Sequence, residues 1–285
     1  MRARLCSAAG VLYVLRDERG PRLRPYDWDG RPLGEGFAIP AADSGVCDPR
    51  ALAVDGDRRL WIADRGARAL RAFSVFGLEV RRLAAPPGRP QRGSGFEQLS
   101  ALAAAGVEDE LLLAAGSGGE RRHALALCAA DGRAPVSLRP LGDPQGRFSG
   151  LCDLVLAGRT LHACEEQAGR IQVFRDGEFH YALRAGGLRP RAIVPLEDGR
   201  VVVAQAGETS ALALLAADGS LARMLATHGE GEGEVCDPCS LALELGADEC
   251  HTRIALLDRG GDRVQVFALD GRCFGSFPDL CCATL

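Results

Sequence analysis

Residues 124–132 read ALALCAADG and residues 211–219 read ALALLAADG, so two stretches far apart in the chain differ at one position. Each joins a short apolar run to Asp-Gly, which favours a tight hairpin turn because glycine tolerates a positive φ. The turn glycine recurs along the chain, once after Phe instead of Asp, at Gly30, Gly77, Gly132, Gly177, Gly219 and Gly271. The chain therefore contains six copies of one hairpin-bearing unit, each of roughly 45 residues.

A second pattern places an acidic residue nine positions before an aromatic residue in four of the units. The pairs are Asp17 and Tyr26, Asp64 and Phe73, Glu165 and Phe174, and Asp258 and Phe267. The apolar runs around them alternate with a period of two, which predicts strands and not helices. In three units an arginine follows the acid by five residues: Arg22, Arg170 and Arg263. We expect each of these arginines to bond to its acid, so that the repeated acids stabilise turns and do not catalyse.

A third element precedes each acid and is clearest in Asp48–Val54 and Asp237–Leu243. Four short strands in a unit of roughly 45 residues is the spacing of a propeller blade. We therefore predict an all-β fold, a six-bladed β-propeller of four-stranded antiparallel blades. The two stretches of this third element are expected to line the central channel.

The motifs of the second unit, Asp48-Pro-Arg-Ala-Leu-Ala-Val-Asp55 and Leu60-Trp-Ile-Ala-Asp64, resemble the NHL repeat, as does the strand Arg263-Val-Gln-Val-Phe267. The resemblance covers nearly the whole chain as one domain, although the first unit is abbreviated and the third and fifth lack the acid and the phenylalanine. The expected blades span residues 1–39, 40–89, 90–142, 143–184, 185–227 and 228–285. The resemblance implies a fold and leaves the function open, because propellers have many unrelated functions.

The composition excludes several kinds of chemistry. There is no lysine and no asparagine, so all 34 basic residues are arginine. Lysine nucleophiles, Schiff bases and P-loops are thereby excluded. The net charge of −4 gives no support to a nucleic-acid partner. No apolar run is long enough to cross a membrane, and we expect none to do so.

The cysteines suggest an intracellular protein. There are eleven, an odd number with scattered spacing, and the amino-terminal residues lack a convincing signal peptide. We therefore expect a cytoplasmic protein whose cysteines are mostly reduced and buried, with Cys281 and Cys282 as exceptions. Cys236 and Cys239 have the spacing of half a zinc site, but no second pair accompanies them, so buried structural thiols are the preferred interpretation.

Two further groups of residues could suggest a metal or acid–base site. The run His228-Gly-Glu-Gly-Glu-Gly-Glu234 also fits a glycine-rich linker between blades, and its glycines would leave the carboxylates unorganised. The histidines share no metal-ligand spacing; they are His123, His162, His180, His228 and His251. We therefore expect no catalytic residues, no metal and no cofactor.

The leading functional interpretation is a non-catalytic module that binds another protein. By analogy with NHL proteins, four arginines gather on one rim as a candidate anchor for an acidic surface: Arg50, Arg65, Arg191 and Arg259. Simple solvated charges are the alternative for these four. Arg- and Ala-rich propellers of this style resemble those accompanying phage-tail-like contractile assemblies in bacteria, which suggests a scaffold role.

The alternative function is a metal-dependent lyase or hydrolase. NHL-type amidating lyases with a His-bound metal, and gluconolactonase-like hydrolases with Glu, Asn and Asp ligands, have similar six-bladed folds. The absence of asparagine counts against the second type, and the scattered histidines count against the first.

Overall fold

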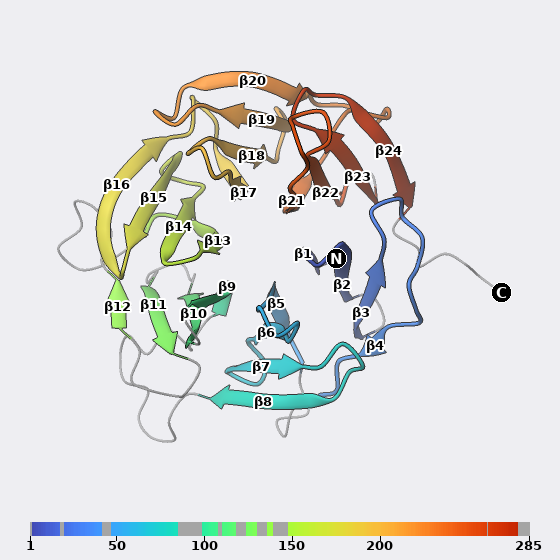
Figure 1. Ribbon diagram of the computed structural model, residues 1–285, viewed down its shortest axis with the longest axis vertical. Coiled ribbons are helices and arrows are strands. Elements are labelled where there is room, and N and C mark those ends of the chain that lie inside the picture. Colours follow the sequence, from blue (N-terminus) through green and yellow to red (C-terminus); the bar gives the residue numbers. More distant parts are fainter. Residues whose placement is uncertain are drawn as a thin grey trace.

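In the computed structural model, six antiparallel four-stranded sheets surround a central axis (Figure 1). The structure describes residues 2–17, 20–41, 47–84, 99–107, 110–117, 124–129, 136–138, 148–260 and 262–278. Within these ranges all the regular elements are strands, which confirms the predicted propeller of four-stranded blades. A helix capable of crossing a bilayer is absent from the same ranges.

Each blade is one continuous stretch of chain, because its four strands pair in chain order. Blade 1 contains β1 (Arg2–Ala8), β2 (Val11–Asp17), β3 (Pro21–Tyr26) and β4 (Phe37–Ala38); blade 2 contains β5 (Pro49–Val54), β6 (Leu60–Asp64), β7 (Ala69–Phe73) and β8 (Glu79–Ala84); blade 3 contains β9 (Leu99–Val107), β10 (Glu110–Ser117), β11 (Ala124–Ala129) and β12 (Val136–Leu138).

The second half of the chain repeats this arrangement. Blade 4 contains β13 (Leu151–Ala157), β14 (Thr160–Glu165), β15 (Arg170–Arg175) and β16 (Glu178–Arg184); blade 5 contains β17 (Pro190–Pro195), β18 (Val201–Gln205), β19 (Ala211–Leu215) and β20 (Leu221–Ala226); blade 6 contains β21 (Pro238–Glu244), β22 (Arg253–Asp258), β23 (Arg263–Ala268) and β24 (Cys273–Pro278). In every blade the first strand is innermost and the fourth lies at the periphery (Figure 1).

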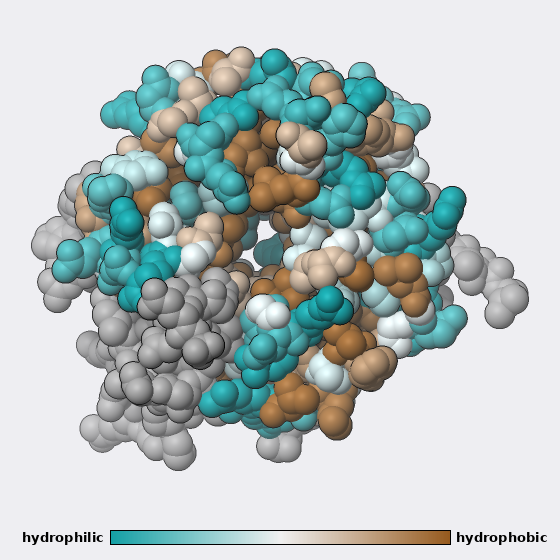
Figure 2. Space-filling model, in the orientation of Figure 1, coloured by the Kyte–Doolittle hydropathy of each residue, from teal (hydrophilic) through white to brown (hydrophobic). Residues whose placement is uncertain are grey.

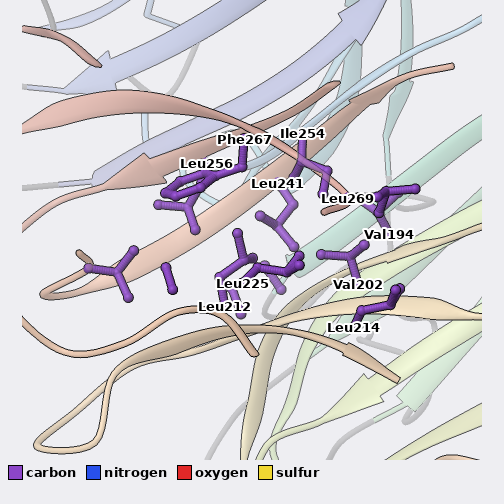
Figure 3. Close-up of a cluster of buried hydrophobic side chains, with 14 residues drawn as sticks. Val194, Val202, Leu212, Leu214, Leu225, Leu241, Ile254, Leu256, Phe267 and Leu269 are labelled. Carbon is purple, nitrogen blue, oxygen red and sulfur yellow. The ribbon is translucent and has the colours of Figure 1, made fainter. Parts of the chain in front are cut away.

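The hydrophobic core lies between the blades. Among the described residues, a buried apolar cluster lies at each of the six junctions between neighbouring blades, so each sheet packs against two neighbours. Figure 3 shows the layer between blades 5 and 6, where Val202, Leu212 and Leu214 meet Leu256 and Phe267. These side chains are almost completely buried. Burying each one contributes roughly 1.5–3 kcal/mol, so the ring is stabilised mainly by contacts between blades.

A buried acceptor at the end of the second strand fixes the start of the first strand in four blades. Its side-chain oxygen accepts a backbone N–H from the residues that lead into the first strand. The pairs are Asp48 N–H to Asp64 (2.9 Å), Ser149 N–H to Glu165 (2.7 Å), Arg189 N–H to Gln205 (2.6 Å) and Asp237 N–H to Asp258 (2.7 Å). The copy in blade 5 was not predicted, because Gln205 replaces the acid there.

The expected arginine–acid contacts are present only in part. Arg170 Nε donates to Glu165 at 2.6 Å, as predicted. Arg22 instead donates to the Glu35 carbonyl at 3.0 Å, and the side chain of Asp17 lies outside the described residues.

The prediction for Arg263 is met only in part, because the ion pair with Asp258 is present but the hydrogen bonds go to other acceptors. Its guanidinium approaches Asp258 only to 3.6 Å and donates to the backbone carbonyls of Glu230, Gly231 and Glu234, each at 2.9 Å. These carbonyls belong to the glycine-rich run that connects blades 5 and 6. The run therefore acts as a linker that Arg263 holds in place, and its Glu side chains are exposed.

In blades 2 and 4 the third strand supplies a donor that we did not predict, seven residues after the acid. Gln172 donates to Glu165 at 2.5 Å, and Arg71 donates to Asp64 at 2.9 Å. Arg71 is fully buried and also bonds to Glu79 at 2.6 Å. A buried guanidinium needs such partners, because an uncompensated buried charge is strongly destabilising.

The ring closes without exchanging a strand between the two ends of the chain, since blades 1 and 6 are each built from consecutive strands. Side chains instead form the junction between blades 1 and 6, which we call the seam. Tyr26 contacts Phe277 with ring centroids 5.9 Å apart, and the Arg253 guanidinium lies over the Trp28 ring at 5.3 Å. The buried residues Leu5, Leu12, Val14, Leu257 and Val264 fill the layer beneath them.

Polar contacts add to the seam. Ser240 Oγ of blade 6 accepts the N–H of Leu5 at 3.1 Å, which joins the inner strands β21 and β1. The nearly buried Arg16 forms an ion pair with Asp262 at 2.5 Å. Together with the aromatic contacts, these bonds fix blades 1 and 6 relative to one another.

Replacing Trp28 by Ala should open the seam. We expect the free energy of unfolding to fall by about 3–5 kcal/mol, because a large buried ring is removed from a packed layer. Urea unfolding followed by far-ultraviolet circular dichroism measures this change. The matched control is Leu33→Ala, a 54% exposed residue of the same blade, which should change stability by no more than about 0.5 kcal/mol. Equal effects of the two substitutions would show that the seam carries no stability.

Candidate functional site

A cavity of about 280 Å³ lies on the axis and is lined by the first strands of all six blades. Figure 2 shows the hollow at the centre of this face, with hydrophobic residues around it. Residues of both predicted channel-lining stretches, Ala51–Val54 and Ser240–Leu243, contribute to its wall, which confirms their placement. Below we call this cavity the channel.

The channel wall is mostly aliphatic, with a few polar groups. Those groups are Arg4, Cys6, Ser7, Ser100, Cys152, Asp153 and Ser240. Arg4 and Asp153 belong to blades 1 and 4, which lie opposite one another in the ring (Figure 1). Within the described ranges, no group of three His, Cys, Asp or Glu side chains could hold a metal ion.

Asp153 joins two blades at the channel wall. Its carboxylate accepts the N–H of Ile193 in blade 5 at 3.0 Å and the N–H of Leu154 at 3.0 Å. Burial among protein atoms raises the pKa of Asp153 to about 6, and these N–H bonds and the positive charge of Arg4 offset the increase only in part. Ser240 holds the equivalent position in blade 6, so the same device occurs twice around the ring.

The histidines do not form a site. His162 is buried in β14, its Nδ1 has no hydrogen-bond partner, and burial lowers the pKa of the ring to about 4. His180, His228 and His251 are exposed on three different segments, and His123 lies outside the described residues.

In five blades a β-bulge near the start of the first strand inserts one extra residue into that strand. The strand register shifts there, so that two residues face one on the second strand. The extra residues are Arg50, Ser100, Cys152, Arg191 and Cys239. Two of the four predicted rim arginines, Arg50 and Arg191, are bulged residues, so they lie where the inner strands begin, at one end of the channel.

The structure brings the four predicted arginines together in two pairs, each around one aspartate. In blade 2, Arg50 and Arg65 contact the same Asp48 oxygen, at 2.9 and 2.7 Å. Asp48 is itself buried at the start of β5. Two guanidinium groups therefore share one carboxylate.

The second pair connects blades 5 and 6. Arg191 of blade 5 contacts Asp237 at 3.1 Å, and Arg259 of blade 6 contacts it at 2.8 Å. Glu166 of blade 4 approaches Arg191 at 3.8 Å. Blades 2 and 5 lie opposite one another, so the two pairs stand on opposite sides of the channel (Figure 1). We call this arrangement the arginine rim, defined by Arg50, Arg65, Arg191 and Arg259.

The described cysteines are all free thiols, but the prediction that they are mostly buried is wrong. Only Cys164 and Cys239 are buried, while Cys250 is exposed and the other five are intermediate: Cys6, Cys47, Cys152, Cys236 and Cys273. Burial raises the pKa of Cys239 to about 11. Cys281 and Cys282 lie outside the described residues.

Comparisons with known proteins show similarity of fold alone. No protein-family profile matches the chain, and no curated protein is significantly similar. Among solved structures, virginiamycin B lyase from Staphylococcus aureus has a TM-score of 0.60 and 11% identity, covering 97% of this chain and 83% of the lyase.

Two other solved structures are similar to the same degree. A gluconolactonase from Xanthomonas campestris has a TM-score of 0.55 and 14% identity, covering 92% of this chain and 80% of that enzyme. A protein of unknown function from Bacteroides caccae has a TM-score of 0.61 and 9% identity, covering 94% of each chain. The chain is thus a β-propeller structurally similar to these proteins.

Replacing Asp153 by Asn should change how stability depends on pH. The pKa of Asp153 is about 6 in the folded chain and about 4 when unfolded, so the folded state binds more protons between these values. Its contribution is present below pH 4 and is lost as the pH rises through 6. We therefore expect the variant to gain about 1–3 kcal/mol relative to the wild type between pH 4 and 7. Urea unfolding at several pH values measures this difference.

His162→Gln is a control for which the change in stability with pH should have the opposite sign. The folded pKa of His162 is about 4, below the unfolded value of about 6.5, so its contribution is lost as the pH falls through this window. This variant should gain relative to the wild type at low pH. Parallel pH curves for Asp153→Asn and the wild type would show that the Asp153 carboxyl is not perturbed.

Proposed function

We propose that the protein is a non-catalytic binding propeller that docks an acidic protein surface on its arginine rim. The observation that supports this most directly is the sharing of one aspartate by two arginines on each side of the channel. Each pair carries two positive charges around a single negative one. Glu166 reduces this excess at the Arg191 pair.

The geometry of the rim suits recognition of carboxylates. A guanidinium has five N–H donors, so two of them exceed what one carboxylate can accept. The shared aspartate fixes the position of each guanidinium group, which lowers the conformational entropy that the side chains lose when a partner binds. The Arg65 side chain is 43% exposed and that of Arg259 is 27% exposed, so both can reach a partner. Bidentate bonds to acidic side chains are the contacts that such forks favour.

The resemblance of the motifs to the NHL repeat supports this proposal, and so does the resemblance in style to propellers of phage-tail-like contractile assemblies. We propose a cytoplasmic scaffold role within such a bacterial assembly.

A metal-dependent lyase or hydrolase is the second candidate. The fold similarity to virginiamycin B lyase and to the gluconolactonase favours it. Metal analysis of the purified protein distinguishes the candidates, because stoichiometric zinc or calcium would favour the enzyme.

The double substitution Arg65→Ala and Arg259→Ala should weaken partner binding more than tenfold, about 1.4 kcal/mol. Each aspartate keeps one arginine, Arg50 or Arg191, so the fold and the melting temperature should be retained. A tagged protein captures the partner from the source cells, and cross-linking identifies it. Affinity is then measured with purified components at two salt concentrations, because contacts between exposed charges weaken with salt.

The matched control is Arg175→Ala with Arg184→Ala, two exposed arginines of blade 4 outside the rim. It removes the same charge and should leave affinity unchanged. Retained binding by the rim variant, or an equal loss in both double variants, contradicts the proposal.

A further inference from the structure

Two thiols lie in direct contact beside the channel. Cys152 is the bulged residue of β13, and Cys164 lies opposite it on β14. Their sulfur atoms are 3.4 Å apart. A bulge sets two residues of one strand against one of its partner, which brings Cys152 and Asp153 together opposite Cys164.

The neighbouring blade completes the surroundings of the pair. Both sulfur atoms lie 3.3 Å from the carbonyl oxygen of Pro190, the first residue of β17. Cys152 Sγ also lies 3.4 Å from the Cys164 carbonyl oxygen. These acceptors orient the two thiols at one point between blades 4 and 5. A disulfide would need the sulfur atoms to approach to about 2.05 Å, which is a small movement.

The two sulfurs differ in access. Cys152 lines the channel and is partly exposed, whereas Cys164 is fully buried. Reagents that enter the channel can therefore reach Cys152 and not Cys164. Cys239 occupies the same bulge position in blade 6, but Leu257 stands where Cys164 does, so that site has one thiol.

We propose that Cys152 and Cys164 form a reversible dithiol–disulfide site that small-molecule disulfides oxidise through the channel. The Cys152 thiolate attacks one sulfur of the disulfide, forming a mixed disulfide and releasing one thiol, which takes up the Cys152 proton. The Cys164 sulfur then attacks Cys152 and releases the second thiol, which takes up the Cys164 proton. Two electrons pass from the protein sulfurs to the reagent. This site is independent of the arginine rim.

Burial governs the rate of the second step. Burial, together with the neighbouring Cys152, raises the pKa of Cys164 well above its usual range. Because only the thiolate attacks, ring closure should be slow near neutrality and should accelerate as the pH rises. The order of attack is fixed, with Cys152 first.

The test exposes the full-length reduced protein to glutathione disulfide at alkaline pH, where ring closure should be fastest, then quenches with acid and alkylates the remaining thiols. Peptide mass spectrometry should find a Cys152–Cys164 cross-link in the wild type, which reduced glutathione reverses. Cys250 is an internal control, since it is exposed and its described side-chain partner is Asp270 and not a thiol. It should retain a glutathione adduct while Cys152 does not.

Two variants separate the steps. Cys164→Ser should accumulate a stable glutathione adduct on Cys152, and Cys152→Ser should leave Cys164 unmodified. If Cys164→Ser fails to fold, Cys164→Ala serves the same purpose. The proposal is overturned if wild-type Cys152 remains unmodified while Cys250 reacts. It is equally overturned by a stable adduct on wild-type Cys152 without a cross-link.

Discussion

The buried acceptor at the end of the second strand is the contact on which the rest of the structure depends. An unpaired backbone N–H inside the protein costs roughly 1–3 kcal/mol, so each acceptor fixes where its inner strand begins. Asp64, Glu165, Gln205 and Asp258 perform this task in four blades. With the inner strands fixed, the bulges fall at equivalent heights, and the blades present matching faces to one another.

The candidate site is built on the same contact. Asp48 is held through its N–H by Asp64, and its carboxylate in turn orients Arg50 and Arg65. Asp237 connects Asp258 to the second arginine pair in the same way. The rim is therefore a continuation of the hydrogen bonds that define the blades, which gives long arginine side chains a fixed geometry.

The sequence was sufficient to predict the six blades and the channel-lining strands, because period-two alternation and repeated turn glycines report on local backbone geometry. Contacts between segments far apart in the chain were harder to predict from the sequence. Gln205 was missed because an amide replaces an acid at a repeated position, and Arg263 was paired with Asp258 although the linker carbonyls compete for it. The Cys152–Cys164 contact depends on a bulge, which no residue pattern in the sequence indicates.

The self-contained blades have a consequence for how such a chain can change over generations. Propellers that exchange a strand between their ends must keep both termini matched. Here each blade is one uninterrupted segment of chain, and among the described residues blades 1 and 6 meet through side-chain packing and bonds from side chains to backbone, without pairing of strands. Duplication or loss of a whole segment would leave every remaining sheet intact and require adjustment only at the seam. The architecture therefore allows a gene to alter its number of repeats without first breaking a hydrogen-bonded sheet.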